Sequence, residues 1–74
     1  MMEIVNGTVI GEIGPAMRGK LYHENRPQTE WIFGNYDSEI RAKALVMIEK
    51  MKAEQGPEYG RLYPSGLELR IWDN

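Results

Sequence analysis

The sequence predicts a small α+β domain in which an antiparallel β-sheet of three to five strands packs against one long helix. Two observations support this fold class. Apolar residues recur at helical spacing across Asp37–Gln55, whereas stretches on both sides of it alternate between apolar and polar residues. Seventy-four residues suffice for one domain, 1–74, with a single layer of each kind. The expected element order is therefore roughly β-β-β-α-β.

The helix carries a start signal and a stop signal. Asp37 and Ser38 are favourable N-cap residues, and Gly56 followed by Pro57 ends helices. Between these signals, one stripe of residues is expected to be buried: Ile40, Ala44, Met47, Ile48 and Met51. At 1.5 Å per residue the helix is about 28 Å long, which is enough to cross a small sheet.

Three stretches before the helix are typical of β-structure. Met2–Ile13 contains Asn6-Gly7, so it predicts either a short hairpin or one bent strand, and both alternatives stay open. Met17–Glu24 alternates and is typical of a half-buried strand, and a turn is expected at residues 25–28.

The third stretch, Thr29–Tyr36, is apolar on both faces, which favours a central position in the sheet. We expect Trp31, Phe33 and Tyr36 to serve the core, with Tyr36 packing on Ile40 in the first helical turn.

After the helix, the sequence indicates a loop and a closing hairpin. The loop is expected at residues 56–60. Residues 61–63 and Leu67–Trp72 flank Pro64-Ser65-Gly66, a turn sequence in which proline fixes φ and glycine accepts positive φ. In the last strand, one face is expected to be apolar: Leu67, Leu69 and Ile71.

The residue inventory does not favour catalysis. The chain has no cysteine, one histidine (His23) and serines only at Ser38 and Ser65. Ser38 is explained as a helix cap and His23 as a partly buried strand residue, so a nucleophile–histidine–acid arrangement is not expected. One histidine with scattered carboxylates does not make a zinc site, and the glycines lack a phosphate-binding spacing. We therefore expect no enzyme activity, no metal and no cofactor.

The charges are interspersed and sum to −2. This balance gives no overall electrostatic signature of nucleic-acid binding. No apolar run approaches the ~20 residues of a membrane span, and the chain lacks a basic signal-peptide start, so a cytoplasmic location is expected. A homodimer is compatible with so short a chain.

The stretch Trp31–Ser38, followed by Ala42 and Leu45, resembles the strand-to-helix junction of two DNA-binding families. These are the plant ethylene-response-factor domains and the arm-binding domains of phage-type tyrosine recombinases. The resemblance covers about 20 residues and implies three antiparallel strands before one helix, with the sheet reading DNA. The chain departs from the pattern by balancing its strand cations with Glu12, Glu24 and Glu30, and by adding the strand at Leu67–Trp72.

Exposed tryptophan, tyrosine and arginine dominate binding hot spots, and alternation places such residues on the wet side of two strands. The predicted partner-binding residues are Arg18, Lys20, Tyr22, Arg70 and Trp72. The sequence therefore favours a non-enzymatic module that binds a larger protein, for example as an inhibitor of the phage or mobile-element type. The alternative is a nucleic-acid-binding domain that uses the hairpin between Arg18 and Arg26.

Overall fold

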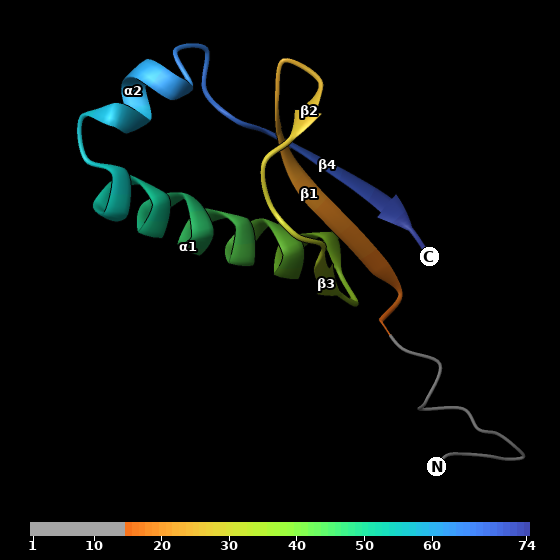
Figure 1. Cartoon of the computed structure of the whole chain (residues 1–74). Helices are drawn as coiled ribbons and strands as arrows, with labels where there is room; N and C mark the ends of the chain where they lie inside the picture. The colour runs from red at the N-terminus through yellow and green to blue at the C-terminus, as the bar shows by residue number, and fades with distance from the viewer. Residues whose placement is uncertain (1–14) are drawn as a thin grey trace, which may run out of the picture.

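The computed structural model describes residues 15–74, and the hairpin or bent strand expected at Met2–Ile13 lies outside them. The elements follow in the order β1 (Met17–His23), β2 (Arg26–Pro27), β3 (Ile32–Gly34), α1 (Asp37–Gln55), α2 (Glu58–Leu62) and β4 (Glu68–Asp73). Four antiparallel strands form one sheet, and α1 crosses one of its faces (Figure 1). The predicted fold class and element order are confirmed.

Strand β1 is the centre of the sheet. It pairs with β4 along one edge and with both β2 and β3 along the other. The long pairing with β4 runs from Met17 opposite Asp73 to Tyr22 opposite Glu68. The central position expected for Thr29–Tyr36 is therefore wrong, because β3 is a three-residue strand that pairs only with the start of β1.

Helix α1 has the predicted bounds, but its first turn is capped differently from the expectation. Tyr36 occupies the N-cap and forms no side-chain cap hydrogen bond, so the capping roles expected for Asp37 and Ser38 are wrong. The Glu39 carboxylate accepts the Asn35 backbone N–H at 2.6 Å, which ties the residue before the N-cap to the first helical turn. At the other end Gly56 has φ +59° and donates its N–H to the Lys52 carbonyl at 2.8 Å, as a glycine stop requires.

The core is small and is centred on Ile40, which is fully buried together with Leu21. Ile40 lies against the sheet where two strand residues are glycines. A Cβ added to Gly19 would lie 3.0 Å from Ile40 Cγ2, and one added to Gly34 would lie 3.1 Å from Ile40 Cγ1. The two glycines thus let the helix approach the strand backbones closely.

The rest of the predicted stripe is confirmed, and its burial decreases along the helix. Ala44 is buried, whereas the three later members are half-buried: Met47, Ile48 and Met51. Figure 1 shows why, because α1 extends beyond the sheet towards α2. Tyr36 is 71% exposed, so the expected packing of Tyr36 on Ile40 is wrong.

Two local predictions need correction. The turn after β1 is formed by Glu24 and Asn25, at φ 51° and 67°, rather than by residues 25–28, because a two-residue hairpin loop requires two positive φ angles. Residues 58–62 form α2 instead of a loop and a strand, so the closing hairpin is wrong and β4 pairs with β1. The turn at Pro64-Ser65-Gly66 is confirmed by φ +81° at Gly66.

Candidate functional site

The five predicted partner-binding residues lie on one side of the sheet, opposite α1. Alternation in β1 directs Gly19 and Leu21 to the core, and the residues between them to the other side. We call this second side the open face. It is formed by Arg18, Lys20, Tyr22, Trp31, Phe33, Glu68, Arg70 and Trp72.

The ring of Trp31 is the common contact of two cations. Arg18 Cζ lies 4.3 Å from the ring centroid, and Lys20 Nζ lies 4.3 Å from it as well. Such cation–π contacts stabilise by about 0.5–1 kcal/mol each at exposed sites. The buried Nε of Arg18 has no hydrogen-bond acceptor among residues 15–74, so the ring is the principal contact of this guanidinium. Trp31 thus brings both β1 cations together at one ring on the open face.

Trp72 connects β4 to β1 and to the residue that precedes β3. Its ring lies edge-on to Trp31, with centroids 5.7 Å apart, and edge-on to Tyr22 at 6.1 Å. The register places it directly opposite Arg18. Edge-to-face geometry is the favourable arrangement for aromatic pairs. Trp72 is still 38% exposed, so it finishes the aromatic cluster while remaining accessible.

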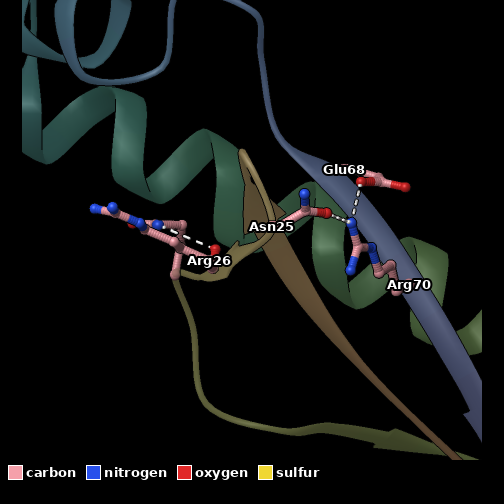
Figure 2. A network of polar contacts seen from close by, with 5 residues as sticks. Asn25, Arg26, Glu68 and Arg70 are labelled. Atoms are coloured by element: carbon pink, nitrogen blue, oxygen red, sulfur yellow. Dashed lines mark hydrogen bonds and ion pairs between the residues drawn. The ribbon is translucent and has the colours of Figure 1, made fainter.

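Arg70 is held on the open face by contacts from three directions. Its guanidinium donates to Asn25 Oδ1 in the β1–β2 turn and to Glu68 Oε1 at 3.0 Å on its own strand (Figure 2). Its Cζ also lies 4.5 Å from the ring centroid of Tyr22. Figure 2 shows Arg26 on the other side of the hairpin from this network. The arginine is therefore positioned before any partner arrives.

The open face has an excess of positive charge although the whole chain is acidic. Three cationic side chains occur on it (Arg18, Lys20 and Arg70) against one carboxylate, Glu68. The formal net charge of the chain is −2. Composition alone conceals this separation of charge, because it averages over both sides of the sheet.

Sequence reasoning missed Trp31 and Phe33, which it assigned to the core. Phe33 is 45% exposed and lies opposite Arg18 on the open face, and Trp31 is half-buried beneath cations. The signal that could have found them is the alternation around Ile32. If Ile32 faces the core, its two neighbours must face away from it.

His23 and Ser65 are the only histidine–serine pair with a direct contact in the described part of the chain. Ser65 Oγ lies 3.5 Å from His23 Nε2, and Glu24 Oε2 lies 4.0 Å from the same nitrogen. A catalytic relay needs the acid on the opposite ring nitrogen and a shorter nucleophile contact. The ring of His23 packs edge-on against Tyr63 at 5.4 Å, and the residue is half-buried as expected.

Two shallow grooves flank α1, one on each side. The larger, of about 380 Å³, has Met47, Met51 and Tyr63 among its lining residues. The smaller, of about 280 Å³, lies between α1 and β4 and includes Leu45, Ile48 and Leu69. His23 lines neither of these two grooves.

Residues 15–74 contain no group of three histidine or carboxylate side chains placed to hold a metal ion. In the same range, neither helix is long and apolar enough to span a membrane. Comparison with protein-family models, with curated proteins and with solved structures finds no match to this chain.

Proposed function

We propose that this protein is a small non-enzymatic binding module that contacts a larger protein partner through the open face. The observation that carries the proposal is the composition of that face. Arginine, tryptophan and tyrosine are the residue types that dominate binding hot spots, and here they form one continuous cluster over β1, β4 and the residue before β3.

The side chains of the cluster already contact one another without a partner, and this supports a binding role. Arg70 is held by Asn25, Glu68 and Tyr22, and two further cations lie against the ring of Trp31. Preordered side chains lose little rotamer entropy when a partner binds, so more of the contact free energy appears as affinity. The aromatic rings are also large and rigid, which lowers the same cost.

The charge of the open face indicates the kind of partner. Three cations against one carboxylate favour an acidic protein surface, and complementary charge raises the rate of association. Inhibition of a larger protein would follow if the module covers that protein's own binding site, because such a role needs no catalysis.

The test compares charge reversals on the two sides of the molecule. Affinity purification from the native host should recover a specific protein with the wild-type chain and with Lys50→Glu, which changes an exposed lysine of α1. Lys20→Glu should weaken capture by about tenfold, which corresponds to 1.4 kcal/mol of binding free energy.

The stability of the Lys20→Glu variant must be checked in parallel. Loss of its contact with Trp31 should cost no more than about 1 kcal/mol of folding free energy, so the variant should remain folded at the assay temperature. Capture that is equal for Lys20→Glu and Lys50→Glu would exclude the open face as the binding surface.

Single-stranded nucleic acid is a second candidate ligand for the same face. Aromatic side chains and cations on a sheet are what base stacking and phosphate contacts require. The faces of Trp31 and Tyr22 are each contacted by cations, so a base would have to displace them in order to stack. A gel-shift series against salt distinguishes the two ligands, because phosphate contacts lose affinity steeply with salt.

A further inference from the structure

Among the described residues, strand β4 has an unpaired edge, which has no part in the function proposed for the open face. Within residues 15–74, β4 pairs with β1 alone. Its second edge therefore presents backbone N–H and C=O groups without a strand partner in that range. Natural edge strands avoid pairing with other chains by means of proline, bulges, short length or inward-facing charge.

Strand β4 has few of these protective features, since Glu68 and Arg70 lie on the open face and the one charge on its core side, Asp73, is its last residue. It is the second-longest strand of the sheet, its sequence Glu-Leu-Arg-Ile-Trp-Asp contains no proline or glycine, and its pairing with β1 is continuous in register. Leu69 and Ile71, which face the core side, are hydrophobic and only half-buried. An edge of this kind is suited to pairing with another strand.

The direction of the free backbone groups follows from the pairing with β1. The Asn74 N–H donates to the Ala16 carbonyl at 2.9 Å, so residue 74 turns its backbone groups towards β1. Successive residues of a strand alternate in this direction. Leu69 and Ile71 therefore direct their N–H and C=O groups to the free edge.

We propose that β4 pairs antiparallel with β4 of a second copy of this chain, with the two-fold axis at Leu69. The axis runs perpendicular to the sheet, so both helices lie on the same side and both open faces lie on the other. Leu69 then lies opposite its own copy, and Leu67 lies opposite Ile71. On the open face, Glu68 of each chain lies opposite Arg70 of the other.

Charge selects this register over its neighbours. A two-fold axis at Arg70 would place that arginine directly opposite its own copy, and like charges opposite each other destabilise a sheet. An axis at Ile71 would place Leu69 opposite Asp73, with one apolar and one charged side chain. A parallel in-register pairing would align Glu68 with Glu68. Only the axis at Leu69 makes both faces complementary.

The groove between α1 and β4 supports the same partner. Among the residues that line it, Leu45 is 62% exposed, and Leu67 and Leu69 are half-buried. A second copy would extend the sheet past β4 and cover the edge side of Leu67 and Leu69. This inference does not depend on the proposed function, because the open face remains uncovered in the dimer.

The first test is sedimentation velocity of the full chain across a wide range of concentration. A reversible doubling of mass is expected. Glu68→Arg alone and Arg70→Glu alone should each weaken the dimer by about tenfold, since each replaces two attractive cross-strand pairs with two repulsive ones. Control reversals at Glu54 and Lys50 on α1 should leave the dimer unchanged.

Mixing the two single variants tests the register itself. In a heterodimer of Glu68→Arg with Arg70→Glu, every introduced charge lies opposite a charge of the other sign. The mixture should therefore recover the wild-type dimer affinity although neither variant does so alone. Failure of the mixture to associate more tightly than its components would overturn the proposal, as would a wild-type chain that stays monomeric at every concentration.

Cysteine crosslinking gives an independent measurement, because the chain has no cysteine of its own. Opposed Cα atoms in a hydrogen-bonded antiparallel pair are about 5.5 Å apart, within the range of a disulfide. Leu69→Cys should form a disulfide-linked dimer on mild oxidation, whereas Arg70→Cys should not, since the diagonal separation is about 7–8 Å. A link through Arg70→Cys alone would contradict the register.

Discussion

Replacement of Gly19 by alanine tests how closely α1 and β4 approach the central strand. A Cβ at this position would lie 2.9 Å from the Arg70 carbonyl oxygen and 3.0 Å from Ile40 Cγ2. Ordinary contacts are about 3.3–3.6 Å for carbon to carbonyl oxygen and about 3.5–4.0 Å between carbons. The new methyl group is therefore too close to both neighbours.

Neither neighbour can move easily. The oxygen belongs to the backbone of β4, and Ile40 is fully buried, with its Cγ1 only 3.1 Å from where a Cβ on Gly34 would lie. Overpacking of this kind costs about 1–3 kcal/mol, and the reduced entropy of the unfolded chain offsets about 0.4–1 kcal/mol of it. The net expectation is a loss of about 1.3 kcal/mol, the difference between the midpoints of the two ranges, with extremes of about 0 and 2.6 kcal/mol. In a domain of this size, each 1 kcal/mol lowers Tm by about 4–8 °C.

Gly60→Ala is the matched control for this measurement. Gly60 lies in α2, nothing lies within 4 Å of an added Cβ, and its φ is not positive. Alanine should therefore stabilise α2, by up to about 1 kcal/mol. Urea and thermal unfolding of both variants give the comparison. A Gly19→Ala protein as stable as Gly60→Ala would refute the close approach described here.

Three further substitutions test other parts of the fold. Ile40→Ala should cost about 2–5 kcal/mol, and an unfolding midpoint close to that of the wild type would show that the core is centred elsewhere. Glu24→Asn should stabilise the hairpin by up to about 1 kcal/mol, because asparagine tolerates the positive φ at this position better than glutamate; a lower Tm would argue against the observed turn. The hydrogen bond from the Asn35 backbone N–H holds the pKa of Glu39 below its ordinary value. The stability that Glu39 adds is therefore fully present above the ordinary glutamate pKa, and it is lost as the pH falls through the lowered pKa of the folded protein. The stability difference between wild type and Glu39→Gln should therefore shrink at acidic pH. Glu49→Gln is the control on the same helix, and an equal dependence on pH for both variants would contradict the role given to the Glu39–Asn35 hydrogen bond.

The parts of the fold that were predicted correctly have local causes. Helix α1 begins and ends where predicted because its periodic stripe and the glycine stop at Gly56 act within a few residues. The two faces of β1 and β4 follow from alternation alone, so residues such as Tyr22 and Trp72 could be placed together on one side.

The errors concern information that is not local. Strand β4 was assigned to a hairpin with residues 61–63, but its partner is β1, about fifty residues earlier. Trp31 and Phe33 were assigned to the core because large rings are usually buried. In the structure, the ring of Trp31 lies against the cations of β1, and Phe33 is partly exposed. Helix α2 was missed because five residues are too few for a periodic pattern.

Site-specific photo-crosslinking tests the central claim, that the open face binds the partner, most directly. A benzoyl-phenylalanine at Phe33 replaces one exposed ring with another on the open face, and the same group at Val46 lies on the solvent side of α1, where 67% of the side chain is exposed. After irradiation in the native host, we expect a covalent adduct with another protein through position 33 and none through position 46. Adducts that form through position 46 but not through position 33 would contradict the account.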